Sequence, residues 1–400
     1  MNKKKVSIIL MFFIAILSTF VFVKNNSNVE ITNEVNNKSK KNRNLLTMNL
    51  EQTAGTGDYK TVTQSEWPTD EYEFNKELSR CENGSEISWD DVNKIVVMSG
   101  DTSDKCYVYF DIARFDKLCN TSTLACHVAK LYTGTQGENG IYYHNTSLTN
   151  GAGDNNYRYA GANPNNYICL GSDATTCPDD NLFRIIGVFG GKVKVIRDKS
   201  VVKMHWDTSN YNTWSISSLN TYLNGTYLTS IGTLSDKIDM ATWKVGGNTW
   251  DNISVSTAKE VYDYEIKNPS TTASTGETEY SAKIGLMYVS DYMFAVLQNN
   301  WTLVAYNSND ATKDYRAVKA ENWLYLGSDE YTITRSSKYS DDVFAIYSSG
   351  EVYSYSVSCG SGEPLPCSVY AKYARPSFYL ISSVEYSGGT GTSSDPIRIK

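Results

Sequence analysis

Residues 182–196 read LFRIIGVFGGKVKVI, and this stretch decides the fold class. Two runs of branched and aromatic apolar residues flank the pair Gly190-Gly191. A Gly-Gly pair accepts the positive φ angles that tight β-hairpin turns require. The pattern therefore predicts a hairpin with strands at 182–189 and 192–196, and it is the clearest hairpin signal in the chain.

Shorter apolar runs separated by turn residues continue this pattern on both sides. Strands are expected at 86–89, 94–98, 106–110, 141–144, 157–160, 283–289, 331–335, 343–347, 351–355, 375–380 and 395–399. Helical spacing is limited to residues 123–132, 216–225 and 257–266. In the last of these, Thr257 and Glu260 form a capping box, and Asn224-Gly225 is a stop signal for the second. The fold class is therefore α+β and dominated by strands.

The composition divides the chain into segments. Residues 25–64 are rich in Asn, Lys, Thr and Gly, which is typical of a disordered linker. We expect a small all-β module at 65–118, a connecting segment with a short helix at 119–139, and a large α+β domain at 140–400.

The first 24 residues have the pattern of an export segment. Lys3, Lys4 and Lys5 precede an apolar run from Val6 to Val23, and Lys24 ends it. A run of about 18 apolar residues is long for a cleaved signal peptide and just long enough to span a bilayer. Cleavage and retention as an N-terminal membrane anchor both remain open. In either case the rest of the chain is expected to be extracellular or at the cell surface.

The overall charge argues against nucleic acid as a partner. Asp and Glu number 44 against 37 for Lys and Arg, which gives a net charge of −7. Binding to phosphate backbones depends on a basic surface, so there is little electrostatic basis for it here. The polarity comes largely from hydroxyl and amide side chains, with Tyr alone present 30 times. This composition is typical of a β-rich extracellular protein.

The cysteines give the strongest physical signal. All eight fall as sequence neighbours, with long gaps after Cys126 and after Cys177, and none has CxxC spacing. Local pairing in an exported protein predicts four disulfides that stabilise exposed loops, whereas free buried thiols are the alternative. The predicted pairs are Cys81 with Cys106, Cys119 with Cys126, Cys169 with Cys177, and Cys359 with Cys367.

No motif for catalysis is found. His127, His144 and His205 are the only histidines, and none belongs to a metalloprotease or nucleophile motif. Asp179-Asp180 and Asp341-Asp342 are sequence neighbours, so on a strand their side chains would point to opposite faces. We therefore expect no catalytic residues and no enzyme activity.

Two weaker signals concern ligands. Asp173, Asp179 and Asp180 lie in one polar loop and could hold Ca²⁺, although the loop lacks EF-hand spacing. No other cofactor is indicated. Trp250 and Trp301 lie in polar surroundings, so they are the candidates for exposed aromatic anchors of a ligand. The alternative is that the tryptophans belong to the core.

Several segments resemble a large group of secreted proteins from Firmicutes and their wall-less relatives. The similar stretches are YRYAGANPNNYICLGSD, CPDDNLFRIIGVFGGKVKVI, KIGLMYVSDY, ARPSFYLISSV and the ending GGTGTSSDPIRIK. The large domain is similar to the DUF6273-type family. That resemblance implies a fold related to C-type-lectin-like and formylglycine-generating-enzyme-like domains. The upstream Cys81-containing segment resembles a small module that often precedes this family.

The leading functional hypothesis is an extracellular recognition or adhesion protein that binds a glycan or a surface protein. Contact with the membrane would occur only through the N-terminal segment. One alternative is a structural component of the cell envelope. The other is an enzyme of the formylglycine-generating type, whose oxidase branch uses a late cysteine pair. In this chain Cys359 and Cys367 are the only late pair, and their Gly-Ser-Gly-Glu-Pro-Leu-Pro context favours a disulfide-closed surface loop.

Overall fold

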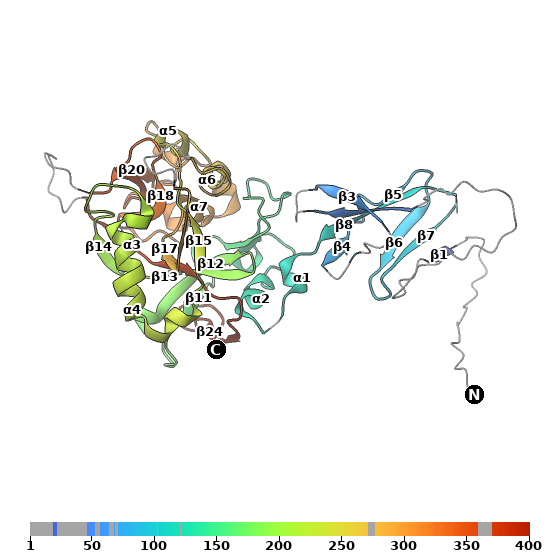
Figure 1. The fold of residues 1–400 in the computed structure, drawn as a ribbon, viewed down its shortest axis with the longest axis horizontal. Coiled ribbons are helices and arrows are strands. Elements are labelled where there is room, and N and C mark those ends of the chain that lie inside the picture. Colours follow the sequence, from blue (N-terminus) through green and yellow to red (C-terminus); the bar gives the residue numbers. More distant parts are fainter. Residues whose placement is uncertain are drawn as a thin grey trace. The chain divides into compact units, whose positions relative to one another are not determined.

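The computed structural model describes residues 19–21, 46–52, 57–63, 68, 71–101, 103–120, 122–270, 277–358 and 370–400. The chain divides into two compact units, Met1–Ala113 and Arg114–Lys400 (Figure 1). The architecture is mixed α+β and rich in strands, which confirms the predicted class at that level.

The first unit is built from strands. β2 runs parallel to β8, while β3 pairs antiparallel with β2, and β4 and β5 pair antiparallel with β8. β6 and β7 match the strands expected at 86–89 and 94–98 and pair antiparallel, and β1 pairs with β7. The bounds are β1 Thr19–Val21, β2 Leu46–Glu51, β3 Tyr59–Val62, β4 Tyr72–Phe74, β5 Arg80–Cys81, β6 Glu86–Asp90, β7 Ile95–Ser99 and β8 Cys106–Ile112.

The predicted linker at 25–64 is wrong where β2 and β3 form. Met48 and Leu50 of β2 pack with Val96, Val108 and Phe110 in the core of this unit. The apolar alternation in β2 is short, and its partner β8 lies some sixty residues later in the chain. The rest of that segment up to residue 45, and the expected export segment apart from β1, lie outside the described residues.

The predicted hairpin is confirmed as β12 and β13, and it forms the middle of a seven-stranded sheet. The sheet order is β17-β22-β13-β12-β10-β9, with β11 also paired to β12. At Gly187 the β12–β13 register shifts, and an added Cβ would lie 1.9 Å from the carbonyl oxygen of Tyr157 on β10. The bounds are β9 Ile141–Tyr143, β10 Tyr157–Tyr159, β11 Tyr167–Cys169, β12 Leu182–Phe189, β13 Lys192–Arg197, β17 Ile284–Gly285 and β22 Ser377–Tyr379.

A five-stranded sheet, ordered β14-β21-β18-β19-β20, and two small antiparallel pairs complete the strands of the second unit. β19 and β20 match the strands expected at 343–347 and 351–355, and the two pair antiparallel. The bounds are β14 Val202–Met204, β15 Ala241–Lys244, β16 Glu279–Ala282, β18 Glu330–Arg335, β19 Asp342–Ile346, β20 Val352–Ser356, β21 Lys372–Ala374, β23 Tyr386–Gly388 and β24 Arg398–Ile399.

The helices are short, and two of them continue as π-helical turns. The capping box of Thr257 and Glu260 opens α6, as predicted. Ser217 caps α3, and the helical path continues beyond Asn224-Gly225, so the predicted stop there is wrong because Gly225 adopts a helical backbone. Residues after Gly285 leave the predicted strand and enter α7. The bounds are α1 Phe115–Leu118, α2 Leu124–Ala129, α3 Ser218–Tyr222, η4 Leu223–Tyr227, α4 Leu228–Ser230, α5 Trp250–Ile253, α6 Ala258–Tyr262, η6 Asp263–Lys267 and α7 Val289–Phe294.

The packing of the second unit begins earlier than the predicted boundary at residue 140. Leu124 and Val128 of α2 are buried in its main core, so the predicted connecting segment at 119–139 is part of this unit. The C-terminal segment lies along β11, where the amides of Tyr167 and Cys169 donate to the carbonyls of Gly391 and Ile397. The chain end is therefore part of the folded domain, as the expected terminal strand implied.

Candidate functional site

A surface groove of about 410 Å³ lies in the second unit beside β10. Residues 160–165, the loop that follows β10, form one wall of it. The other contributions come from Leu131, from Asn139 and Gly140, and from Thr390 near the C-terminus. Segments separated by more than 200 residues in the sequence thus meet at this groove.

The loop at 160–165 is held from behind by Arg184 of β12. Its guanidinium donates to Asn166 Oδ1 at 2.8 Å, to the carbonyl of Pro164 at 3.3 Å and to Asn163 Oδ1 at 3.4 Å. The group is stacked between the rings of Tyr167 and Trp323, whose centroids lie 4.1 and 4.7 Å away. Burial lowers the pKa of Arg184 to about 10. Arg184 has no carboxylate within ion-pair distance among the described residues, so neutral oxygens and two aromatic rings hold this cation in place.

Backbone contacts fix the floor of the groove. The amide of Ala160 donates to the carbonyl of Gly140, and the amide of Gly161 donates to Ala295. Gly140 has a φ of +70°, and an added Cβ would lie 2.9 Å from Cβ of Pro164. The loop therefore has a defined shape before any ligand arrives, which lowers the entropy cost of binding.

The lining carries no charged side chain. Asn139, Asn163, Asn165 and Thr390 offer amide and hydroxyl groups, and Leu131 and Pro164 add apolar surface. Asn163, Asn165 and Thr390 are exposed to solvent. Such a lining suits a neutral ligand that donates and accepts hydrogen bonds, such as a sugar or a peptide backbone.

The two tryptophans expected to be exposed are placed otherwise. Trp301 is fully buried, and its indole N–H donates to the carbonyl of Val296 at 2.9 Å, so its prediction as a ligand anchor is wrong. Trp250 is half-buried, and its ring lies 4.5 Å from that of the exposed Tyr353. Neither residue lines the groove. The alternative reading of the tryptophans as core residues holds for Trp206, Trp214, Trp243, Trp301 and Trp323.

The three aspartates proposed for calcium do not converge. Asp179 pairs with Lys199 and Asp180 pairs with Arg197, both at 2.5 to 2.6 Å, and both carboxylates are largely exposed. Asp173 is also exposed. Among the described residues no three His, Cys, Asp or Glu side chains gather as a metal-binding group.

Three of the predicted disulfides are present: Cys81–Cys106, Cys119–Cys126 and Cys169–Cys177. Cys359 and Cys367 lie outside the described residues. His127 stacks on Tyr386 with ring centroids 3.6 Å apart, and burial lowers its pKa. His144 is buried, and its Nδ1 accepts the amide of Ala152, while burial holds its pKa well below the usual range.

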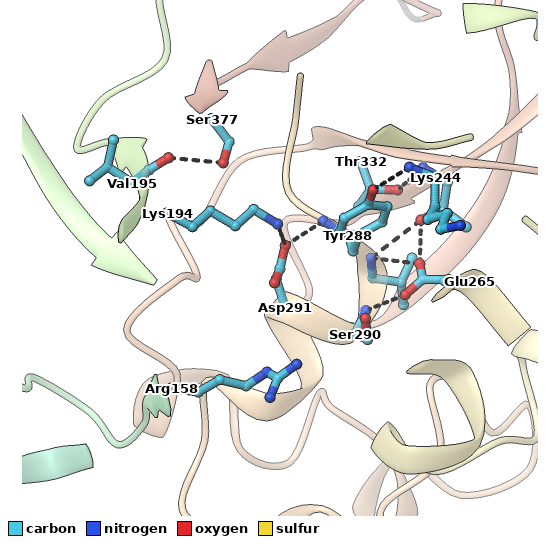
Figure 2. Close-up of polar contacts among 12 residues, drawn as sticks. Arg158, Lys194, Val195, Lys244, Glu265, Tyr288, Ser290, Asp291, Thr332 and Ser377 are labelled. Atoms are coloured by element: carbon cyan, nitrogen blue, oxygen red, sulfur yellow. Dashed lines mark hydrogen bonds and ion pairs between the residues drawn. The ribbon is translucent and has the colours of Figure 1, made fainter. Parts of the chain in front are cut away.

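A buried group of charges lies where β13 faces α7 (Figure 2). Lys194 Nζ is 2.5 Å from Asp291 Oδ2, and the two side chains are 1 % and 6 % exposed. Asp291 Oδ2 also accepts the amide of Tyr288 at 2.8 Å. Close by, the carboxylate of Glu265 accepts the amides of Val289 and Ser290, each at 2.9 Å. These hydrogen bonds fix the first turn of α7 around Asp291.

Arg158 lies on the other side of this group and has its own partner. Its guanidinium donates to both oxygens of Asp154, at 2.8 and 2.6 Å, and the hydroxyl of Tyr262 donates to the same carboxylate. The Arg158 cation holds the pKa of Asp154 well below its usual range, against the effect of burial. Arg158 and Asp154 thus form a neutral pair beside Lys194 and Asp291.

Neither the groove beside β10 nor the buried charges around Lys194 was predicted from the sequence. Lys194 alternates with Val193 and Val195, which suggests a lysine that points to solvent on a half-buried strand. The signal that could have identified its burial is the partner strand β12, whose residues Phe183–Val188 are buried without alternation, as in strands covered on both faces. The groove loop carries the residues AGANPN, which are typical of a turn and do not by themselves indicate a site.

No protein-family model, no curated protein and no solved structure matches this chain. Within the parts of the chain that the structure describes, no helix has the length and apolar character needed to cross a membrane. The three disulfides indicate an oxidising environment of the extracellular kind.

Proposed function

We propose that this protein is an extracellular, non-catalytic recognition protein, and that its second unit binds a neutral glycan in the groove beside β10. The observation that carries the proposal is a preformed groove lined by amides, a hydroxyl and apolar surface, without a charged side chain. The segment resemblance to the DUF6273-type family adds a lectin-like fold to the proposal. A protein ligand that presents its backbone to the same amides is the alternative outcome of the test.

The test is a glycan array and a pulldown of surface proteins with the full exported chain. Ala162 is exposed at the groove, so Ala162→Trp should fill the groove and abolish binding without disturbing the core. Asn165 is exposed and takes part in no side-chain hydrogen bond within the described structure, so Asn165→Ala should weaken binding by about tenfold, the value of one hydrogen bond.

Asn309→Ala is the matched control, since Asn309 is exposed and lies outside the groove lining. It should bind like the unchanged protein. Binding that survives Ala162→Trp would assign the ligand to another surface, and arrays and pulldowns without any bound ligand would contradict the recognition function itself.

A further inference from the structure

The contact between Lys194 and Asp291 is unusual in its surroundings. The ammonium of Lys194 lies 4.4 Å from the ring centroid of Tyr288, 5.4 Å from Trp243, and 5.7 Å from both Phe189 and Tyr379. The side chain is 1 % exposed, and the paired carboxylate is 6 % exposed. An amine and a carboxyl group are thus held in contact inside a cage of four aromatic rings.

Burying an ion pair in such a cage costs free energy. Two charges removed from water lose their hydration, and their mutual attraction repays that loss only in part. Burial accordingly lowers the pKa of the Lys194 ammonium, against the effect of Asp291. A neutral amine is the nucleophilic form of lysine, and desolvation is the usual way in which proteins make it available.

We propose that Lys194 and Asp291 are joined by an intramolecular amide bond between Nζ and Cγ. In this step Nζ attacks Cγ, the C–N bond forms, and the bond from Cγ to one carboxyl oxygen breaks. That oxygen leaves as water with two of the three protons of the original ammonium. An ammonium and a carboxylate become one neutral amide and one water, so no oxidant, reductant or second substrate is needed.

The described contacts supply what this condensation requires. The distance of 2.5 Å between Nζ and Oδ2 places the nucleophile beside the carboxyl group, which replaces a bimolecular encounter by a fixed geometry. The amide of Tyr288 donates to Oδ2 at 2.8 Å, so a hydrogen-bond donor faces the oxygen that gains negative charge during attack. The aromatic rings keep bulk water, which would reverse the reaction, away from the product.

Glu265 is a positioning residue in this arrangement. Its two carboxylate oxygens hold the amides of Val289 and Ser290, the two residues that precede Asp291. The hydroxyl of Thr334 donates to the same carboxylate. Asp291 is thereby fixed from the backbone, independently of its contact with Lys194.

The same strand provides an internal comparison. Lys192 Nζ is also 2.5 Å from a carboxylate, that of Asp239, but these side chains are 41 % and 21 % exposed. The contact distance is the same, whereas these side chains are open to water and, among the described residues, no aromatic ring is recorded over Lys192. We expect no amide at this second pair, so it separates the effect of burial from that of contact.

The experiment is intact-mass measurement of the full chain after reduction of its disulfides. The expected mass is lower by one water molecule than the mass calculated for the chain from its observed N-terminal residue. Trypsin should then release Val193–Arg197 joined to Ile284–Lys313, with no cleavage after Lys194. Lys192 should be cleaved normally, as an unmodified lysine is.

Lys194→Arg should restore the full mass of the sequence, and Asp291→Asn should give the same linked peptides with loss of ammonia in place of water. The unchanged protein decides the question even if a variant does not fold. A correctly folded chain with the full mass and separate peptides would overturn the proposal, and so would a linked peptide that joins Lys192 to Asp239.

Discussion

The second unit buries positive charge in two different ways. Lys194 and Arg158 each have a carboxylate partner, whereas Arg184 has only neutral oxygens and two aromatic faces. A guanidinium tolerates this because its charge is spread over a planar group with five donors, which an ammonium cannot imitate. This side chain holds the groove loop together with the backbone hydrogen bonds of Ala160 and Gly161.

We expect Arg184→Lys to destabilise the second unit by about 2–3 kcal/mol, because Asn166 Oδ1 and the Pro164 carbonyl would lose buried hydrogen bonds. Urea unfolding measures the change. Arg197→Lys is the control, since the carboxylate that Arg197 contacts, that of Asp180, is 95 % exposed, and the change should cost less than about 1 kcal/mol. Equal losses in the two variants would contradict the role assigned to Arg184.

Glu265 should make stability depend on pH. Burial raises the pKa of Glu265 from 4.5 to about 7, so the folded state keeps a proton that the unfolded state has already released. The stabilisation that protonated Glu265 gives to the folded state is complete below about pH 4.5 and is lost as the pH rises through about 7. The free energy of unfolding should therefore fall over this interval, by up to about 1.4 kcal/mol per pH unit. Glu265→Gln should flatten this slope in urea titrations, and an unchanged slope would assign it to another group.

Among the elements, those with a complete local signal were predictable. The β12–β13 hairpin has its turn residues and both apolar strands within 15 residues of sequence, and α6 has its capping box. β2 was missed because its partner β8 is distant in sequence. The helical stretch from α3 to α4 is longer than predicted. Asn224-Gly225 predicts a helix stop, but glycine can also adopt the helical backbone, and Gly225 does so here.

Gly187, where β10 and β12 pair, is the glycine with the least space for a side chain among the described residues. An added Cβ would lie 1.9 Å from the Tyr157 carbonyl oxygen, so Gly187→Ala has to separate β10 from β12. We expect a loss of more than about 2 kcal/mol in thermal or urea unfolding. Gly225→Ala is the matched control, because it lies in a helical stretch with open space around it and should stabilise by about 0.5–1 kcal/mol. A tolerated alanine at position 187 would show that the bulge can relax.

At the scale of the molecule, each described disulfide belongs to one compact unit. Cys81–Cys106 closes a separation of 25 residues in the first unit, and Cys169–Cys177 closes 8 residues in the second. In the chain-entropy description their removal costs about 3.5 and about 2.5 kcal/mol respectively. Replacing each pair by serines should lower only the unfolding transition of its own unit in calorimetry. A shift of both transitions by one pair would show that the units unfold together.

The groove could not be predicted from the sequence, for a physical reason. Its walls come from Leu131, the loop after β10 and Thr390, and only the folded chain brings them together. The residues of the loop were visible in the sequence, but asparagine, proline and glycine are equally common in ordinary turns. For Trp301 the sequence suggested exposure where the fold shows burial. Its sequence neighbours are polar, but its ring is fully buried.

The buried tryptophans also give this protein optical properties of its own. The indoles of Trp206 and Trp214 lie 5.1 Å apart with their planes tilted by 59°, and neither is exposed. Two chromophores so close share their excited states, so the second unit should show a paired positive and negative circular-dichroism signal that neither ring produces alone. Loss of that signal would report directly that the packing of this part of the core has opened.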